Sequence, residues 1–162
     1  MEKTFALVSL GCAKNLVNSE QMLYLMDEAG YTLVPEAEGA DLVIVNTCGF
    51  IDSAKEEAID TILAAAQLKA EGKVRKILVT GCLSQRYQGD ILQEMPEVDG
   101  ILGTGSYTKI VPAIEQLLSG HKVVDFGSID APEEEIGRVV TTPEHFSYIK
   151  IAEGCNNRCA FC

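Results

Sequence analysis

The sequence predicts an α/β fold, in which a doubly wound and mostly parallel sheet carries helices on both faces. Short runs of apolar and β-branched residues alternate along the chain with longer segments whose apolar residues recur at helical spacing. The run at residues 41–46 holds four consecutive apolar residues, which is typical of a central parallel strand buried on both faces. Such alternation implies right-handed crossover connections, and these place helices on both sides of the sheet.

The first half of the chain supplies three of the predicted strands and two helices. Residues 4–10 form an apolar, β-branched run and are predicted as a strand, and a helix follows over residues 15–29 and stops at Gly30. Residues 31–34 are predicted as a short strand and residues 41–46 as the central one. The next helix, over residues 53–70, opens with Ser53 and Glu56 at the spacing of a capping box. Its predicted apolar stripe consists of Ala58, Ile59, Ile62, Leu63 and Ala66.

The second half continues the alternation and then loses it. Strands are predicted over residues 76–80 and 100–102, with a helix near residues 88–95 between them and a second helix capped by Thr108 after them. From residue 121 to 143 the pattern weakens around an acidic run at residues 133–135, which we interpret as a linker or peripheral segment with a solvated acidic face. Residues 146–151 are predicted as a new strand. We therefore expect a flavodoxin-like domain over residues 1–140 and the start of a second domain over residues 141–162.

Composition and charge narrow the class of protein. Apolar residues make up 47% of the 162 residues and the formal net charge is −11, as expected for a soluble acidic domain of ordinary size. An acidic surface repels phosphate, so direct nucleic-acid binding by this segment is not expected, whereas a basic protein partner is. The sequence has no apolar stretch long enough to span a membrane and no secretory signal at its start. We therefore expect a cytoplasmic protein whose six cysteines serve metal binding or catalysis.

Three of the cysteines are far apart in sequence but occupy equivalent places. Cys12, Cys48 and Cys82 each follow a predicted parallel strand and each adjoin a glycine. The carboxyl ends of parallel strands meet at one edge of a sheet, so we expect the three thiols to converge there. Three convergent thiolates suit a soft metal or an iron–sulfur cluster. The alternative interpretation is that they are three small apolar side chains buried at strand ends.

The other three cysteines lie within the last eight positions. Cys155, Cys159 and Cys162 have the spacing C-x3-C-x2-C, which can bind three irons of one cluster and leave the fourth open. A zinc knuckle is the competing use of such dense cysteines, but it usually adds a histidine, and His145, ten residues upstream of Cys155, is interpreted as a surface residue. Because the chain stops at its last cysteine, we expect it to be a fragment of a longer protein.

The two cysteine groups carry a family resemblance. The spacing of the last three cysteines, with Phe161 before Cys162, resembles the cluster motif of radical S-adenosylmethionine enzymes. The stretches SLGCAKN at 9–15, NTCGFI at 46–51 and TGCL at 80–83 resemble the amino-terminal domain of methylthiotransferases. The resemblance covers essentially the whole chain. Around Cys12 and Cys48 the chain is similar to the ribosomal-protein branch of the family, whereas the tRNA branch tends toward GCQMN and C-x-V-R at these two places. Asn18 stands where the family commonly has aspartate.

The resemblance implies a two-cluster enzyme. Cys155, Cys159 and Cys162 would hold a 4Fe-4S cluster that binds S-adenosylmethionine through its open iron, and Cys12, Cys48 and Cys82 would hold a second 4Fe-4S cluster that carries or delivers sulfur. The implied substrate is the β-carbon of an aspartate on a small-subunit ribosomal protein, the twelfth, with an electron donor of flavodoxin type or similar. Residues 141–162 would then be the first strand and cluster loop of a truncated radical-enzyme barrel, and the fragment alone would be inactive.

Two other functions stay open at this stage. One is a tRNA adenosine methylthiotransferase with the same chemistry. The other is a non-catalytic, flavodoxin-like metal-binding module whose terminal cysteines bind zinc. No catalytic residue is predicted beyond the cluster ligands. The polar neighbours of the first cysteine group are interpreted mainly as structural, although they are also candidates for bonding to cluster sulfurs or balancing cluster charge: Lys14, Asn15, Ser19, Asn46 and Arg86.

Overall fold

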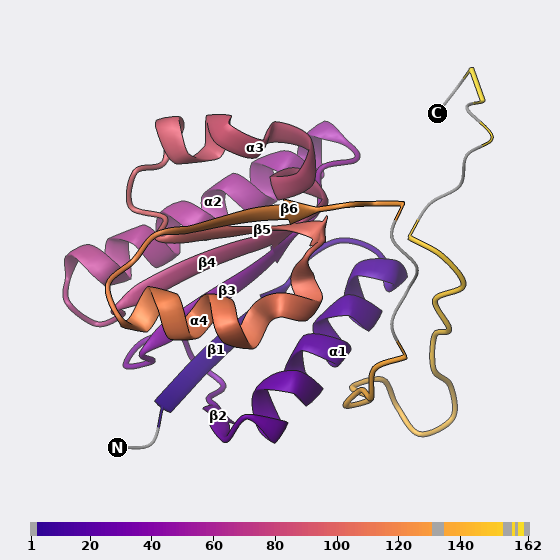
Figure 1. The fold of residues 1–162 in the computed structure, drawn as a ribbon, viewed down its shortest axis with the longest axis horizontal. Helices are drawn as coiled ribbons and strands as arrows, with labels where there is room; N and C mark the ends of the chain where they lie inside the picture. Colours follow the sequence, from indigo (N-terminus) through magenta and orange to yellow (C-terminus); the bar gives the residue numbers. More distant parts are fainter. Residues whose placement is uncertain (1–2, 131–134, 154–156, 158, 161–162) are drawn as a thin grey trace.

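A computed structural model of the chain describes residues 3–130, 135–153, 157 and 159–160. Its described part holds a six-stranded sheet in which every pair of neighbouring strands is parallel, with the strand order β2-β1-β3-β4-β5-β6 (Figure 1). The strands are β1 (Lys3–Ser9), β2 (Tyr31–Leu33), β3 (Leu42–Thr47), β4 (Lys76–Gly81), β5 (Gly100–Gly105) and β6 (Val123–Gly127). The helices are α1 (Ala13–Glu28), α2 (Asp52–Ala70), α3 (Cys82–Glu94), η1 (Tyr107–Lys109) and α4 (Ile110–Leu118).

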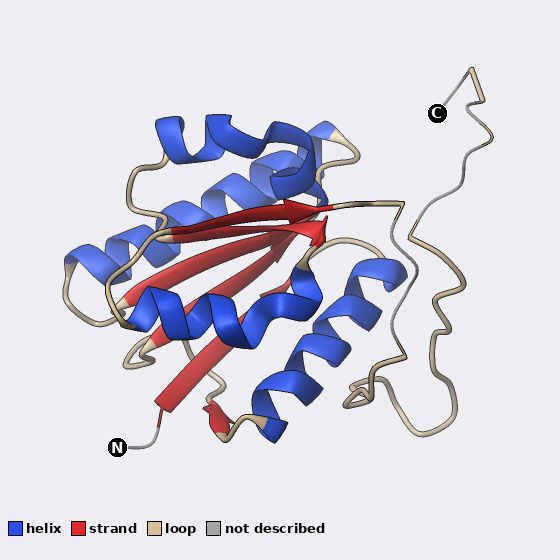
Figure 2. Cartoon of the chain, viewed as in Figure 1, coloured by secondary structure: helices blue, strands red, loops and turns tan. Residues whose placement is uncertain are grey.

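Helices cover both faces of the sheet, as predicted (Figure 2). On one face α1 and α4 bury Met22, Met26 and Ile114 against strand residues such as Phe5 and Ile44. On the other face α2 and α3 pack through a second apolar cluster, which includes Ala58, Ile62, Leu83, Ile91 and the strand residues Val43, Val45, Ile77 and Val79. Because alternate residues of β3 enter the two clusters, the whole strand is buried, as its unbroken apolar run predicts. No helix in the described part of the chain is long and apolar enough to cross a bilayer.

Several local predictions differ from the structure. The predicted capping box is wrong: α2 begins at Asp52 with Ile51 as its N-cap residue, and no side chain caps it. Ile59 and Leu63 of the predicted stripe are exposed, because the helix face that meets the sheet is narrower and is formed by Ala58, Ile62 and Ala65. The helix predicted near 88–95 begins six residues earlier, at Cys82, and has a break at Gln88, where φ is 35°.

The segment after α4 also differs from its prediction. Residues 123–127, which fall in the predicted linker, form the edge strand β6 and pair with β5. Residues 146–151 are not a strand, so that prediction is wrong for this chain. A strand needs a partner for its backbone hydrogen bonds, and the edge strands of the described sheet, β2 and β6, do not pair with this segment. Part of the acidic run, residues 133–134, lies outside the described residues.

Residues 135–153 run beside α1 rather than away from the domain (Figure 1). The backbone N–H of Val139 donates to the carbonyl of Glu20 in α1 at 3.1 Å. The Glu20 carboxylate in turn accepts hydrogen bonds from the backbone N–H and the hydroxyl of Thr141, at 2.6 and 2.8 Å. The peripheral segment is therefore attached along the outer side of α1. The proposed boundary between two domains at residue 140 stays a prediction.

Candidate metal centre

The first three cysteines lie at the carboxyl edge of the sheet, each just after one of three neighbouring strands. Cys12 is the N-cap residue of α1 after β1, Cys48 follows β3 directly, and Cys82 is the first residue of α3 after β4. Strands β1, β3 and β4 are adjacent in the sheet. Since Asn46 pairs with Thr80 in the parallel register, Cys48 and Cys82 stand at matching positions two residues further along. The topology thus brings together thiols from three distant parts of the sequence.

Two glycines let the cysteine-bearing loops approach one another closely. Gly11 has φ 94°, and a Cβ on it would lie 2.6 Å from Cβ and 3.1 Å from Sγ of Cys48. Gly81 has φ 96°, and a Cβ there would lie 2.3 Å from the carbonyl oxygen of Thr47. Both backbone conformations disfavour side chains, and both positions lack the room for one. Glycine at these two places is therefore what allows the loop before Cys12 to touch Cys48 and the start of α3 to pack against the end of β3.

The three thiols differ in exposure, from the buried Cys48 through Cys82 to the exposed Cys12. Burial raises the pKa of the Cys82 thiol, and the nearby Cys48 and Cys12 add to this increase, whereas the Lys14 ammonium opposes it. Cys82 therefore stays a neutral thiol at neutral pH until a metal displaces its proton. Cys12 and Cys48 therefore both lie close enough to Cys82 to influence its thiol.

Buried amides fasten this edge of the sheet together. Asn15 donates from Nδ2 to the carbonyls of Leu10 at 2.7 Å and Thr47 at 3.0 Å, which ties α1 to the loops before Cys12 and Cys48. Asn46 donates from Nδ2 to the carbonyl of Asn15 at 2.9 Å and to the hydroxyl of Ser19 at 2.8 Å. The side-chain N–H donors of Asn15 and Asn46 are occupied by protein acceptors. These contacts favour the interpretation of both residues as structural.

Charged neighbours of the first triad also have protein partners. Arg86 donates from Nη1 to the carbonyl of Gly49 at 3.2 Å and lies over the ring of Tyr87. Lys14 forms an ion pair with Glu153, in the segment just before the second cysteine group. Ser84, two residues beyond Cys82, has a fully buried hydroxyl that no described residue bonds. The Ser84 hydroxyl is therefore a donor without a described partner close to Cys82 in sequence.

The three cysteines of the sheet edge are a sulfur-only donor set. Among the described residues no group of three or more His, Cys, Asp or Glu side chains has the arrangement that would hold a single metal ion. Three thiolates from three loops are the donors that a soft metal or an iron–sulfur cluster takes. Sulfur-only donors with glycine-lined approaches suit such a group. The role of Cys12, Cys48 and Cys82 as ligands stays a prediction.

The second cysteine group is only partly described. Cys159 is exposed and is not in a disulfide, while Cys155 and Cys162 lie outside the described residues. His145 is exposed and contacts the ring of Phe146 edge-on at 5.2 Å, which fits its interpretation as a surface residue. The role of Cys155, Cys159 and Cys162 in binding a cluster and S-adenosylmethionine stays a prediction.

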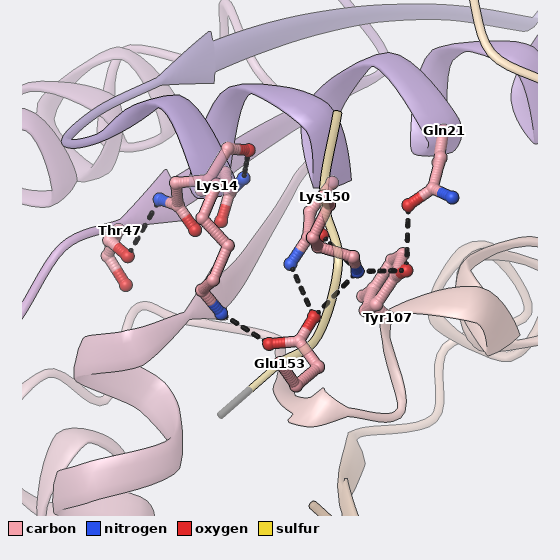
Figure 3. Close-up of polar contacts among 9 residues, drawn as sticks. Lys14, Gln21, Thr47, Tyr107, Lys150 and Glu153 are labelled. Carbon is pink, nitrogen blue, oxygen red and sulfur yellow. Dashed lines mark hydrogen bonds and ion pairs between the residues drawn. The ribbon is translucent and has the colours of Figure 1, made fainter. Parts of the chain in front are cut away.

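Sequence reasoning missed the polar contacts that residues 150–153 make with α1 and η1. Glu153 bonds to Lys14 and Asn18, and Lys150 bonds to Asn18 and Tyr107 (Figure 3). A weak signal existed in the sequence, since Lys14 lies two residues after Cys12 and Glu153 lies two residues before Cys155. Oppositely charged residues that flank two candidate ligand groups are reasonable partners, but only the fold shows that they meet.

The sequence model of the family described as "Uncharacterized protein family UPF0004" matches residues 4–103, a stretch that contains all three cysteines of the sheet edge. The chain belongs to this family. The match covers β1 through most of β5, with the loops that carry Cys12, Cys48 and Cys82, and ends before α4 and β6.

Curated relatives extend the similarity over nearly the whole chain. A protein of Clostridioides difficile (strain 630) named "Ribosomal protein uS12 methylthiotransferase RimO" is 47% identical over 158 residues, covering 97% of this chain and 36% of the relative. Proteins of the same name from Thermoanaerobacter sp. (strain X514) and Caldicellulosiruptor saccharolyticus are 44% and 50% identical, covering 99% and 96% of this chain and 37% and 36% of the relatives. The chain thus spans little more than a third of these relatives. The resemblance to the amino-terminal part of methylthiotransferases is confirmed.

Proposed function

We propose that this chain is part of a methylthiotransferase that acts on ribosomal protein uS12, at the β-carbon of an aspartate, and that it supplies the ligands of two iron–sulfur clusters. The observation that carries the proposal is the meeting of Cys12, Cys48 and Cys82 at the ends of three adjacent parallel strands. The relatives named as uS12 methylthiotransferases support the substrate. The net charge of −11 suits a basic ribosomal protein as partner.

The chemistry requires a cofactor, because no acid–base side chain removes hydrogen from an unactivated carbon near neutral pH. When bound, the clusters and S-adenosylmethionine would supply the radical chemistry and the sulfur. The chain's own residues have simpler tasks. Cys155, Cys159 and Cys162 would hold the cluster with the open iron, and the three cysteines of the sheet edge would hold the other.

The surroundings of the first triad suit this task. Gly11 and Gly81 allow the loops to approach, and Asn15 fixes two of them by hydrogen bonds. Lys14 offsets negative charge near Cys82. The buried Cys48 and the exposed Cys12 would place one ligand within the protein and one at its surface, so sulfur chemistry would face outward. We further propose that an electron donor of flavodoxin type serves the enzyme and that it acts in the cytoplasm beside ribosomes.

Iron counting after anaerobic reconstitution tests the cluster assignment. The full-length protein should bind about eight irons, as two four-iron clusters, and about four after Cys12, Cys48 and Cys82 are replaced by alanine. A matched variant with Cys155, Cys159 and Cys162 replaced should also keep about half of the iron. One tightly bound zinc, with no visible absorption, would instead indicate the non-catalytic metal-binding module.

Substrate choice is tested with S-adenosylmethionine, a reductant and either uS12 or tRNA. A mass increase on uS12, mapped to one aspartate, is expected. A mass increase on tRNA alone would overturn the substrate assignment while leaving the cluster assignment intact.

A further inference from the structure

A buried lysine anchors the segment that leads into the second cysteine group. The Lys150 side chain is only 3% exposed. Its ammonium donates to Asn18 Oδ1 at 2.7 Å, Tyr107 Oη at 3.0 Å and Glu153 Oε1 at 2.8 Å (Figure 3). These acceptors among the described residues suit the N–H donors of a lysine, and the ring of Tyr107 lies 4.9 Å from the same nitrogen. Hydrogen bonds of this kind are what allow a charged group to stay buried.

Glu153 is the second anchor, and it has three partners of its own. Its carboxylate, in a side chain that is 14% exposed, accepts from Lys150, from Asn18 Nδ2 at 3.1 Å and from Lys14. Burial alone would raise the pKa of Glu153, but the hydrogen bonds from Lys14 and Lys150 outweigh it and hold the pKa below its ordinary value. The group is therefore a carboxylate at neutral pH.

This network joins the surroundings of the two cysteine groups. Lys14 stands in the first turn of α1, two residues after Cys12, and Glu153 precedes Cys155 by two residues. The ion pair between the two side chains therefore attaches the segment before Cys155 to the turn of α1 that follows Cys12.

The burial of the network separates it from ordinary surface ion pairs. Exposed pairs contribute little to stability, because water screens them and their side chains lose entropy. The Lys109–Asp125 pair at β6, with side chains 58% and 35% exposed, is of this kind. Loss of one partner in a buried network leaves another charge poorly solvated, and the structure then has to open to water. The buried pair should therefore govern whether residues 150–153 stay docked.

We propose that Lys150 and Glu153 are positioning residues, which dock the segment that leads into the second cysteine group onto α1, Tyr107 and Lys14. The functional importance of this docking rests on the proposed function, since it matters for catalysis only if both groups hold clusters. The contacts that the described residues make in this docking are between protein side chains, so the docking can be tested in the metal-free protein.

Limited trypsin digestion of the purified metal-free protein tests the docking directly, because the buried Lys150 side chain has to leave the network before the protease can bind it. Glu153→Gln keeps the shape of the side chain and removes its charge. It should speed cleavage after Lys150 by about tenfold, because the loss of a hydrogen bond between charged groups makes local opening of this segment easier. Asn18→Ala, which removes a partner of both Lys150 and Glu153, should have a similar effect. Cleavage after the exposed Lys122, outside the network, should not change.

The matched control is Asp125→Asn, which removes an equivalent but exposed lysine–carboxylate pair. It should leave cleavage after Lys150 unchanged. Equal rates of cleavage after Lys150 in the unmodified protein and in Glu153→Gln would overturn the proposal. Iron binding by the protein with Cys155, Cys159 and Cys162 replaced is measured separately: its absence would refute the proposed function, whereas the digestion result would still decide the docking.

Discussion

The side-chain amide of Asn15 donates a hydrogen bond to the carbonyl of Thr47 at 3.0 Å, and so connects α1 to the residue directly before Cys48. The same nitrogen donates to the carbonyl of Leu10 at 2.7 Å. One buried side chain therefore fixes the loops that carry two of the three cysteines. The two elements it joins are 32 residues apart in sequence.

Replacement of Asn15 by alanine should weaken both the fold and the metal site. The change leaves two carbonyl groups without their donor at a buried position, and we expect a loss of about 1–3 kcal/mol in the free energy of unfolding. Urea denaturation measures it, and iron content after reconstitution should fall in the same variant. Gln93→Ala, at an exposed amide of α3, should change stability by less than about 0.5 kcal/mol. Equal effects of the two changes would contradict the role of Asn15.

Gly81→Ala should be more damaging than an alanine at another glycine of similar backbone conformation. Its Cβ would fall 2.3 Å from the carbonyl oxygen of Thr47, whereas a Cβ on Gly72, with φ 75°, would have no atom within 4 Å. Gly72→Ala should therefore cost only the left-handed conformation, about 1–2 kcal/mol. Gly81→Ala adds the steric overlap and should exceed that cost clearly. Thermal unfolding measures the difference between the two variants. Equal decreases in the unfolding temperature would mean that the backbone near Thr47 and Gly81 can move apart at no cost in stability.

The strands and the cysteine edge could be predicted from local patterns because each depends on a short stretch of sequence. An unbroken apolar run is enough to indicate β3, and a cysteine after each of three parallel strands is enough to place the thiols at one edge. Strand β6 was not predicted, since its five residues include Asp125 and Gly127 and lie at the sheet border, where little burial is required. The start of α3 was missed because Gly81 suggests a loop.

Features that depend on partners far away in sequence could not be predicted. The pattern of residues 146–151 favours a strand, but a strand forms only beside another one, and here the segment follows α1 instead. The contact of Lys14 with Glu153 spans 139 residues, and no local rule relates the two positions. Correlated substitutions among relatives are the signal that would reveal such a pair.

Asp99 should make the stability of the fold depend on pH in the acidic range. It lies at the amino end of β5, at the opposite sheet edge from the cysteines, and accepts from Lys69 at 2.5 Å, Lys76 at 3.0 Å and the backbone N–H of Ile77 at 2.9 Å. Burial alone would raise its pKa, but these hydrogen bonds outweigh it and lower the pKa from the ordinary value of 3.8.

The direction of the effect follows from this lowered pKa. Since the folded state holds the proton less tightly than the unfolded state, the stabilisation by Asp99 is complete above pH 3.8 and is lost as the pH falls from there through the folded-state pKa. Asp99→Asn should remove about 1–3 kcal/mol at neutral pH and reduce the slope of stability against pH in the acidic range. Urea unfolding at several pH values measures both. Asp52→Asn, in an exposed pair with Lys55, is the control and should have almost no effect.

The three thiols of the sheet edge should react with iodoacetamide at different rates in the metal-free protein. Cys12 is exposed, whereas Cys48 is only 8% exposed and burial raises the pKa of Cys82. Because the thiolate is the reactive form, Cys82 should be alkylated at least about tenfold more slowly than Cys12 near pH 8, and Cys48 should also be slow because it is buried. Mass spectrometry of peptides follows each site, and in denaturant the differences should disappear.

Anaerobic reconstitution with iron and sulfide should then change this order. If the three thiols bind one cluster, Cys12 loses its high reactivity together with the other two, because a ligated sulfur is not a free nucleophile. In a variant in which Cys48 alone is replaced by alanine, protection of Cys12 and Cys82 should fall at the same time, since a cluster that loses one of three ligands is less firmly held. Protection of Cys82 that persists while Cys12 stays reactive would show that the thiols act separately, and would contradict a shared cluster at this edge.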